Sequence, residues 1–208
     1  MSSQRQGLWY EVLDVVVNIL VIVAIVVGIR TFLVSPFQVD GNSMLNTLED
    51  KEYIVINKLA YFIGTPQRGD VVVLLPPGDH SKYFVKRIIG TPGDQVIIDG
   101  GNVFIRPAGQ KKAEKLDEDA YLMESNRGHT FPKPNKNDDQ NRVSYTVPAG
   151  RYFLLGDNRQ NSTDSRSFVD QTGAPVPFVP QADIKGKVWF IVLPLSKIHA
   201  LAPPAYAR

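Results

Sequence analysis

Hydrophobic residues are grouped into one long run near the amino terminus and many short runs after it. The long run occupies residues 15–34, close to the roughly 20 residues that a helix needs to cross a bilayer core. Only Asn18 and Arg30 interrupt it, and Trp9 precedes it, as aromatic residues at a membrane interface often do. The pattern predicts one transmembrane helix within residues 1–34, with a buried core helix as the alternative.

The end of the long run does not resemble a processing site. It is followed by Ser-Pro-Phe-Gln at residues 35–38, and not by the small residues of a signal-peptide cleavage site. We therefore expect an uncleaved amino-terminal anchor. The charges on its two sides do not by themselves decide its orientation.

The later apolar runs are short, rich in β-branched residues and separated by turn residues, which is typical of strands. Asp-Gly-Gly-Asn at residues 99–102 lies between two runs and predicts a tight hairpin, because glycine can adopt a positive φ. We expect a mainly β protein with a twisted, antiparallel, barrel-like sheet after the anchor. The expected strands are 52–57, 70–75, 83–89, 96–98, 103–105, 143–147, 151–155 and 187–192.

Residues from about 106 to 142 are polar and charged and interrupt the strand pattern. They predict a loop-rich insertion on the surface, with one short helix at 113–124. The tail, 195–208, is expected to be a loose end. The 208 residues therefore divide into an anchor, 1–34, and one β-rich domain, 35–208, that carries the insertion.

Composition narrows the chemistry. The net charge is only +2 and the basic residues are scattered, so nucleic-acid binding is not indicated. The chain has no cysteine, which excludes a thiolate nucleophile and Cys-ligated zinc. His80, His129 and His199 show no metal-ligand spacing. We expect neither a metal nor another cofactor.

Lys86 stands in the middle of an apolar strand at 83–89, where lysine usually marks an edge or a wet face. By alternation, Phe84 and Ile88 share its face and Arg87 lies on the other. Lysine can act as a base only when neutral, which requires its pKa to fall about 3 units from about 10.4, at a cost of about 4 kcal/mol. Burial against apolar side chains can produce such a shift. Arg87 is expected to face elsewhere and to stay charged.

Two further stretches stand apart: Val-Asp-Gly-Asn-Ser-Met-Leu at 39–45 and Gly-Asp-Asn-Arg-Gln-Asn-Ser-Thr-Asp-Ser-Arg at 156–166. Each alone is compatible with an ordinary turn. Together with residues 35–38, 68–74 and 82–94, in this order behind one anchor, they resemble the type I signal peptidases. These are membrane-bound Ser-Lys endopeptidases, and the resemblance extends over most of the chain.

The resemblance implies specific roles. Ser43 would be the nucleophile and Lys86 the general base, since a serine hydroxyl attacks a carbonyl only when a neighbour takes its proton. Ser162 would orient the lysine amine. Asp164 and Arg166 would form an ion pair that braces the loop.

Other positions follow from the same resemblance. Gly156 would give the backbone room near the lysine, and the amide of Ser43 would donate to the oxyanion of the intermediate. Some family members add a serine or threonine hydroxyl two positions before the nucleophile, but this chain has Gly41 there. Asn42 or another backbone amide would substitute.

The expected substrate pocket is shallow and suits small side chains, with Val39 and Val85 in its walls. The chain reads Ser-Met-Leu-Asn-Thr at 43–47, where the family usually has proline in place of Asn46. Asparagine removes the fixed φ of proline, so we expect a looser turn.

The resemblance implies signal peptides of exported preproteins as substrates, cut after small-x-small motifs, and the lipid bilayer as a second partner. It places the amino terminus in the cytoplasm and the catalytic domain outside the plasma membrane. Self-cleaving repressors use a related Ser-Lys site, but they are soluble and bind DNA, so the anchor argues against them. The alternative from another class is a catalytically silent, membrane-tethered β-domain that binds exported chains.

Overall fold

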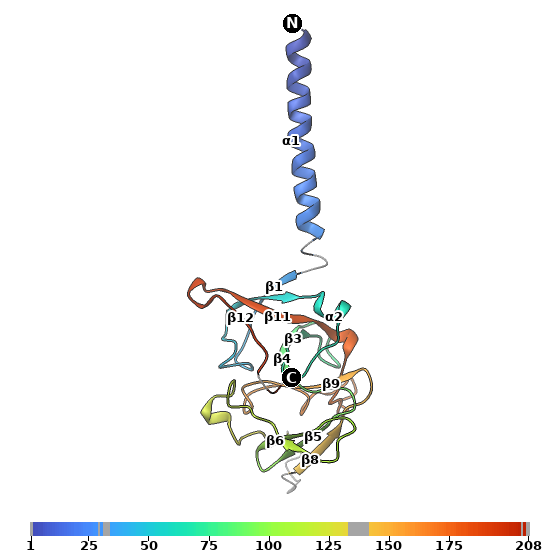
Figure 1. Cartoon of the computed structure of the whole chain (residues 1–208), viewed down its shortest axis with the longest axis vertical. Coiled ribbons are helices and arrows are strands. Elements are labelled where there is room, and N and C mark those ends of the chain that lie inside the picture. The colour runs from blue at the N-terminus through green and yellow to red at the C-terminus, as the bar shows by residue number, and fades with distance from the viewer. Residues whose placement is uncertain (1, 29, 31–33, 133–141, 205, 207–208) are drawn as a thin grey trace.

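The computed structural model describes residues 2–28, 30, 34–132, 142–204 and 206. Its first element, α1 (Ser2–Gly28), projects away from the rest of the protein (Figure 1). Within it, Trp9–Gly28 has 20 residues with a mean hydropathy of 2.5 and no buried part, so it is long and apolar enough to cross a membrane. The predicted helix is present over Ser2–Gly28, whereas Val34, which the prediction included in the anchor, belongs to β1.

Among the described residues, the larger of two sheets has eight strands. Adjacent strands in this sheet are antiparallel. Its order is β1-β2-β11-β3-β4-β9-β10, and β12 pairs with β11. These strands are β1 (Val34–Gln38), β2 (Tyr53–Asn57), β3 (Val71–Leu74), β4 (Phe84–Gly90), β9 (Arg151–Leu155), β10 (Val179–Pro180), β11 (Ile184–Leu193) and β12 (His199–Ala200). The expectation of a mainly β, antiparallel protein is confirmed.

A second sheet lies at the end of the domain away from α1 (Figure 1). Its order in the described part of the chain is β7-β6-β5-β8, again antiparallel. The strands are β5 (Gln95–Asp99), β6 (Asn102–Arg106), β7 (Glu114–Lys115) and β8 (Arg142–Thr146). Gly100 and Gly101 have φ of +53° and +77°, so the predicted hairpin is confirmed.

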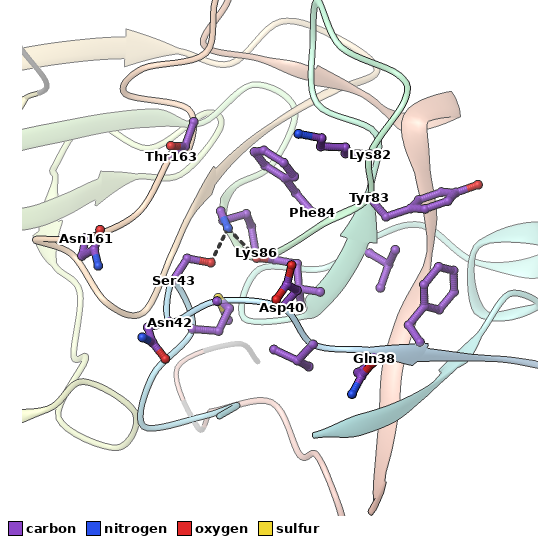
Figure 2. A pocket seen from close by; sticks show the side chains of 16 residues that line it. Gln38, Asp40, Asn42, Ser43, Lys82, Tyr83, Phe84, Lys86, Asn161 and Thr163 are labelled. Atoms are coloured by element: carbon purple, nitrogen blue, oxygen red, sulfur yellow. Dashed lines mark hydrogen bonds between the residues drawn. The ribbon is translucent and has the colours of Figure 1, made fainter. Parts of the chain in front are cut away.

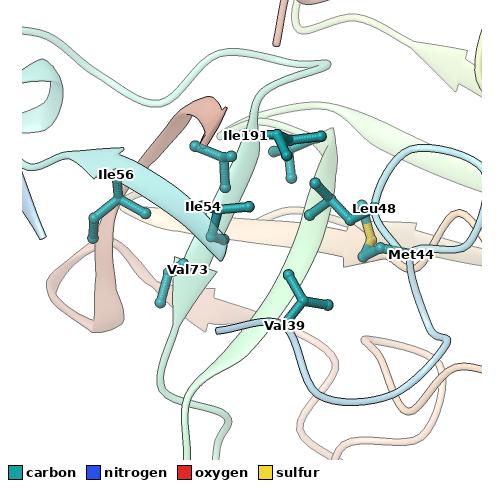
Figure 3. Packing of buried hydrophobic residues seen from close by; sticks show 9 residues of the cluster. Val39, Met44, Leu48, Ile54, Ile56, Val73 and Ile191 are labelled. Atoms are coloured by element: carbon teal, nitrogen blue, oxygen red, sulfur yellow. The ribbon is translucent and has the colours of Figure 1, made fainter. Parts of the chain in front are cut away.

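Alternation along the strands places one apolar face in the core. In β2, Ile54 and Ile56 are fully buried, whereas Tyr53 is 38% exposed. These isoleucines belong to a cluster that Figure 3 shows beside β1 and the segment after it. The other buried members are Val39, Met44, Leu48, Val71, Val73, Val188 and Ile191. Val39, before Ser43, and Met44 and Leu48, after it, are therefore core residues, which fixes the segment between β1 and β2.

The prediction of a helix at 113–124 is wrong. Glu114–Lys115 form β7, and turns follow until the short 3₁₀ helix η2 (Glu124–Asn126). The reason is tertiary: Glu118 is buried in an ion pair with Arg159, a contact that local helix propensity cannot represent.

The expectation of a loose tail is also wrong for the residues that the structure describes. After η4 (Leu195–Lys197), β12 pairs with β11, and Leu201 packs against the cluster of Figure 3. Tyr206 packs against the core beside the second sheet. Two further short helices, α2 (Ala60–Ile63) and η3 (Gln181–Asp183), connect strands.

Candidate active site

Ser43 lies in a tight turn between β1 and β2. The Leu45 amide donates to the Asn42 carbonyl at 3.2 Å, and the Leu48 amide donates to the Met44 carbonyl at 2.8 Å. Met44 and Leu48 are 1% and 0% exposed, so one side of the turn is packed into the core. Ser43 itself is half-buried and faces the opposite side, toward β4 (Figure 2).

Lys86 reaches Ser43 from β4. Its Nζ lies 2.6 Å from Ser43 Oγ and donates to the Val85 carbonyl at 2.8 Å (Figure 2). The side chain is 3% exposed, and Nζ lies 5.2 Å from the centre of the Phe84 ring. Phe84 and Ile88 belong to one apolar cluster. The apolar surroundings expected from the strand pattern are present, and the two side chains expected to react are in contact.

Gly156 lies between the Ser43 turn and the loop that carries Ser162. A Cβ atom on Gly156 would be 2.1 Å from Ser162 Oγ and 2.5 Å from the Ser43 carbonyl oxygen. Only glycine therefore allows these segments to approach so closely. The space that a side chain at position 156 would need is occupied by Ser162, which is 3% exposed, and by the backbone of Ser43.

Asp164 and Arg166 form a buried ion pair, with Arg166 Nη2 2.7 Å and Nε 2.8 Å from the two carboxylate oxygens. Burial raises the pKa of Asp164, but hydrogen bonds and charge from Arg166, with contributions from the Gly156 amide and the Ser162 side chain, hold it below its usual range. The pair spans the end of the loop on which Ser162 lies. The expected ion pair is therefore present.

The sequence reasoning missed a second buried ion pair, between Arg87 and Asp157. Arg87 Nε and Nη2 donate to the carboxylate at 2.9 and 2.7 Å, and Thr47 Oγ1 donates to the same carboxylate at 2.5 Å. Burial would lower the pKa of Arg87, but the charge of Asp157 raises it above its usual value, so Arg87 stays charged. The signal that could have revealed the pair is alternation, which turns Arg87 away from Lys86 into the protein, where a cation requires a carboxylate.

The backbone around Ser43 leaves its amide available. Asn158 holds the two neighbouring carbonyls, because its amide donates to the Ser43 carbonyl and its Nδ2 to the Asn42 carbonyl, both at 3.0 Å. Gly41 donates to Asp50 at 2.7 Å. Within the described residues, the amides of Asn42 and Ser43 and the side-chain nitrogen of Asn42 donate to no acceptor. These donors belong to Ser43 itself and to the residue before it.

The expected looser turn at Asn46 is not observed. Asn46 has a φ of +86°, and its Nδ2 donates to the Tyr121 carbonyl at 2.9 Å. Asparagine tolerates this left-handed conformation better than most residues, whereas proline is locked near −65°. The turn is therefore of a different kind from one containing proline, and it is tied to the inserted segment.

A cavity of about 660 Å³ opens beside the serine and the lysine. Val39 and Val85, the two residues expected in the pocket, both line it. Phe37 and Tyr83 meet edge to face in another part of its wall, with ring centres 5.2 Å apart. The cavity is mainly apolar near Val39 and Val85, and Asp40, Lys82, Asn161 and Thr163 add polar groups.

The histidines do not contribute to this site. His80, His129 and His199 are exposed and lie outside the residues that line the cavity. Within the ranges that the structure covers, no group of three or more His, Asp or Glu side chains could hold a metal ion. Ser43 and Lys86 both line the cavity and lie in contact with each other.

Comparison with known proteins supports one family. Residues 12–193 match the model of the family described as signal peptidase, peptidase S26. Signal peptidase I P of Bacillus subtilis subsp. natto is 34% identical, covering 91% of this chain and 93% of that protein. Signal peptidase I of Pseudomonas aeruginosa is 33% identical, covering 80% of this chain and 67% of that protein.

Among solved structures, a signal peptidase I of Enterococcus faecalis is 32% identical, covers 59% of this chain and 95% of its own, and has a TM-score of 0.41. The family match includes the Ser43 turn, β4 and the loop of 156–166. It also begins within α1 and continues to the end of β11. Since this match covers most of the sequence, the chain belongs to the signal peptidase family, peptidase S26.

Proposed function

We propose that the protein is a membrane-bound serine endopeptidase that removes signal peptides, with Ser43 as nucleophile and a neutral Lys86 as general base. The observation that carries the proposal is the 2.6 Å contact between Lys86 Nζ and Ser43 Oγ in a buried site. Burial in apolar surroundings disfavours the charged form of a lysine. A neutral amine can accept the serine proton on its lone pair while one N–H donates to the Val85 carbonyl at 2.8 Å.

The chemical steps follow from this contact. Lys86 takes the hydroxyl proton as Ser43 Oγ attacks the substrate carbonyl, and the lysine then gives a proton to the leaving amine. The oxyanion needs hydrogen-bond donors, and the free amide of Ser43 is the first candidate. Asn42, through its amide or side chain, is the second. Water then attacks the acyl-enzyme as Lys86 accepts its proton, and Lys86 returns that proton to Ser43 Oγ as the bond between Oγ and the acyl carbon breaks.

The loop 156–166 would hold the Lys86 amine in the orientation that it needs to reach Ser43 Oγ. Ser162 packs against Gly156, next to the backbone of Ser43, and we assign it the orientation of the lysine amine. The Asp164–Arg166 pair would maintain the shape of this loop. Because Gly156 has no side chain, Ser162 and Ser43 can approach from opposite sides.

The substrate would bind as an extended strand beside the cavity, using main-chain hydrogen bonds for affinity and pockets for specificity. Val39 and Val85 would restrict the pockets to small side chains, which favours small-x-small motifs before the cleaved bond. Both valines and Ser43 line the cavity of about 660 Å³. The substrate would therefore bind and be cleaved at the same surface.

The membrane determines where the reaction takes place. The apolar α1 would be the anchor, with the amino terminus in the cytoplasm and residues 35–208 outside the plasma membrane. Figure 1 shows α2 and β1 at the end of the domain from which α1 projects. In α2, Phe62 and Ile63 are 87% and 85% exposed, which suits contact with lipid. Cleavage would thus occur close to the bilayer.

The test is cleavage of a peptide that contains Ala-x-Ala by the full-length protein in detergent. We expect cleavage after the second alanine, and loss of cleavage in both Ser43→Ala and Lys86→Ala. Ser144→Ala, in an exposed position of β8, is the matched control and should leave the rate unchanged. If the unaltered protein binds the peptide but leaves it intact, the silent binding domain is favoured instead.

A further inference from the structure

Asn46 connects the nucleophile turn to the inserted segment. Its backbone has a φ of +86°, and its side chain points away from the turn to donate to the Tyr121 carbonyl at 2.9 Å. The two residues are 75 positions apart in the sequence. The neighbouring Thr47 is fixed independently, because its hydroxyl donates to Asp157 at 2.5 Å. The carboxyl-terminal half of the turn is therefore held at two successive residues.

The partner of Asn46 is itself rigidly held. Tyr121 is 5% exposed, and its hydroxyl donates to Glu118 Oε1 at 2.7 Å. Glu118 forms a buried ion pair with Arg159, whose Nη1 lies 3.1 Å from Oε2. Arg159 is 1% exposed, and its Nε donates to the Gly156 carbonyl at 3.1 Å. Hydrogen-bonded residues thus link Asn46 to the loop that carries Ser162.

The same inserted segment holds that loop at further points. Arg159 Nη1 donates to Thr130 Oγ1 at 2.8 Å, and the Gln160 amide donates to Asn126 Oδ1 at 3.2 Å. Arg166 Nη1 donates to the Phe131 carbonyl at 3.2 Å. Residues 118–131 therefore contact both segments that meet at Gly156. The expected surface insertion thus also makes contacts with the rest of the domain at these residues.

We infer that Asn46 is a positioning residue for Ser43: by bonding the Tyr121 carbonyl, it fixes the nucleophile turn against the same support that holds the Ser162 loop. This inference rests on the proposed function of Ser43. A serine that is only slightly misplaced relative to its base loses rate, because the reacting atoms must be held close to the productive geometry. Residues 118–131 thereby become a support of the active site.

Two variants separate the side-chain bond from the backbone conformation. Asn46→Gly keeps the positive φ and removes the donor, and Asn46→Asp keeps the size of the side chain but replaces the donor with an acceptor. Both should lower kcat on the Ala-x-Ala peptide about tenfold or more, with KM nearly unchanged. Asn102→Asp is the matched control, since its Nδ2 donates to the Gly100 carbonyl at 3.0 Å in the distant hairpin. It should leave kcat at the wild-type value.

The readouts distinguish positioning from a merely structural role. If Asn46 only stabilises the fold, both variants will unfold at lower temperature, but the folded protein will keep its wild-type kcat, and the inference is overturned. The Ser43→Ala variant is measured in parallel. An inactive Ser43→Ala with fully active Asn46 variants refutes the positioning role alone, whereas an active Ser43→Ala refutes the proposed function itself.

Discussion

Lys86 and Arg87 are neighbours on β4, and each is only 3% exposed, but their surroundings differ in kind. Arg87 meets the carboxylate of Asp157 through two hydrogen bonds and lies 4.0 Å from the centre of the Tyr121 ring. Lys86 Nζ meets a hydroxyl and a carbonyl and lies over the Phe84 ring. Equal burial therefore goes with different polar partners at the two positions.

The difference shows how one strand can serve two purposes. A buried cation stays charged when a carboxylate with good geometry compensates for its lost hydration, which is the case for Arg87. A buried lysine in apolar surroundings can release its proton and become a base, which is the role we propose for Lys86. Alternation along β4 keeps the two environments on opposite faces.

Replacing Lys86 with arginine should have the largest effect on activity. Lys86→Arg keeps a long cationic side chain, but a guanidinium cannot be deprotonated in a protein. We expect kcat/KM on the Ala-x-Ala peptide to fall roughly a thousandfold or more. Peptide cleavage by the full-length variant in detergent measures this, with circular dichroism to confirm the fold. A variant with substantial activity would show that position 86 does not act as a base.

The reverse exchange, Arg87→Lys, should mainly affect stability. Lysine keeps the charge but cannot reproduce the two parallel bonds to Asp157 or the bond from Arg87 Nη1 to the Gly69 carbonyl at 2.9 Å. We expect the free energy of unfolding to fall by roughly 2 kcal/mol. Denaturant titration in detergent provides the measurement. Arg142→Lys is the control, because Arg142 and Asp99 form an exposed pair 3.7 Å apart.

The smallest effect concerns acid stability. The pKa of Asp164 in the folded protein is below its ordinary value of 3.8. The ionised carboxylate therefore stabilises the fold when the pH is above about 3.8. This contribution is lost as the pH falls through the folded-state pKa. The difference in unfolding free energy between wild type and Asp164→Asn should therefore be constant near neutral pH and shrink below about pH 4. Urea titration over a pH series tests this.

Asp119→Asn is the control for the acid series. Asp119 pairs with Arg127 at 3.4 Å, but the side chains are 74% and 44% exposed. An exposed pair contributes at most about 1 kcal/mol, so this variant should follow wild type at each pH. If Asp164→Asn also follows wild type, the buried pair does not stabilise the loop.

Local sequence patterns predicted much of the sheet. The runs around Ile54 and Ile56, and the glycines of the 99–102 hairpin, carry their conformation in their own side chains. The contact of Ser43 with Lys86 could not be derived from spacing, because 43 positions separate them and only the fold closes that distance. The family resemblance supplied this pairing before the structure did.

The two predictions of local structure that were wrong share a physical cause. The helix expected at 113–124 and the loose turn expected at Asn46 were both judged from local propensity. In the folded protein Glu118 is fixed by Arg159, and Asn46 by the Tyr121 carbonyl, across 41 and 75 positions. Partners so distant in sequence leave no periodic signal, and local propensity does not represent the contacts that they make.

The central claim is that the Lys86 amine is neutral when other lysines are charged. The protonation state can be followed by nitrogen NMR of the full-length protein in detergent, labelled at the lysine Nζ, with the Lys86→Arg variant to assign the signal. We predict that near pH 8, where ordinary lysines remain charged, the Lys86 signal is that of a neutral amine. An ammonium signal for Lys86 that persists up to about pH 10 would contradict its role as the general base.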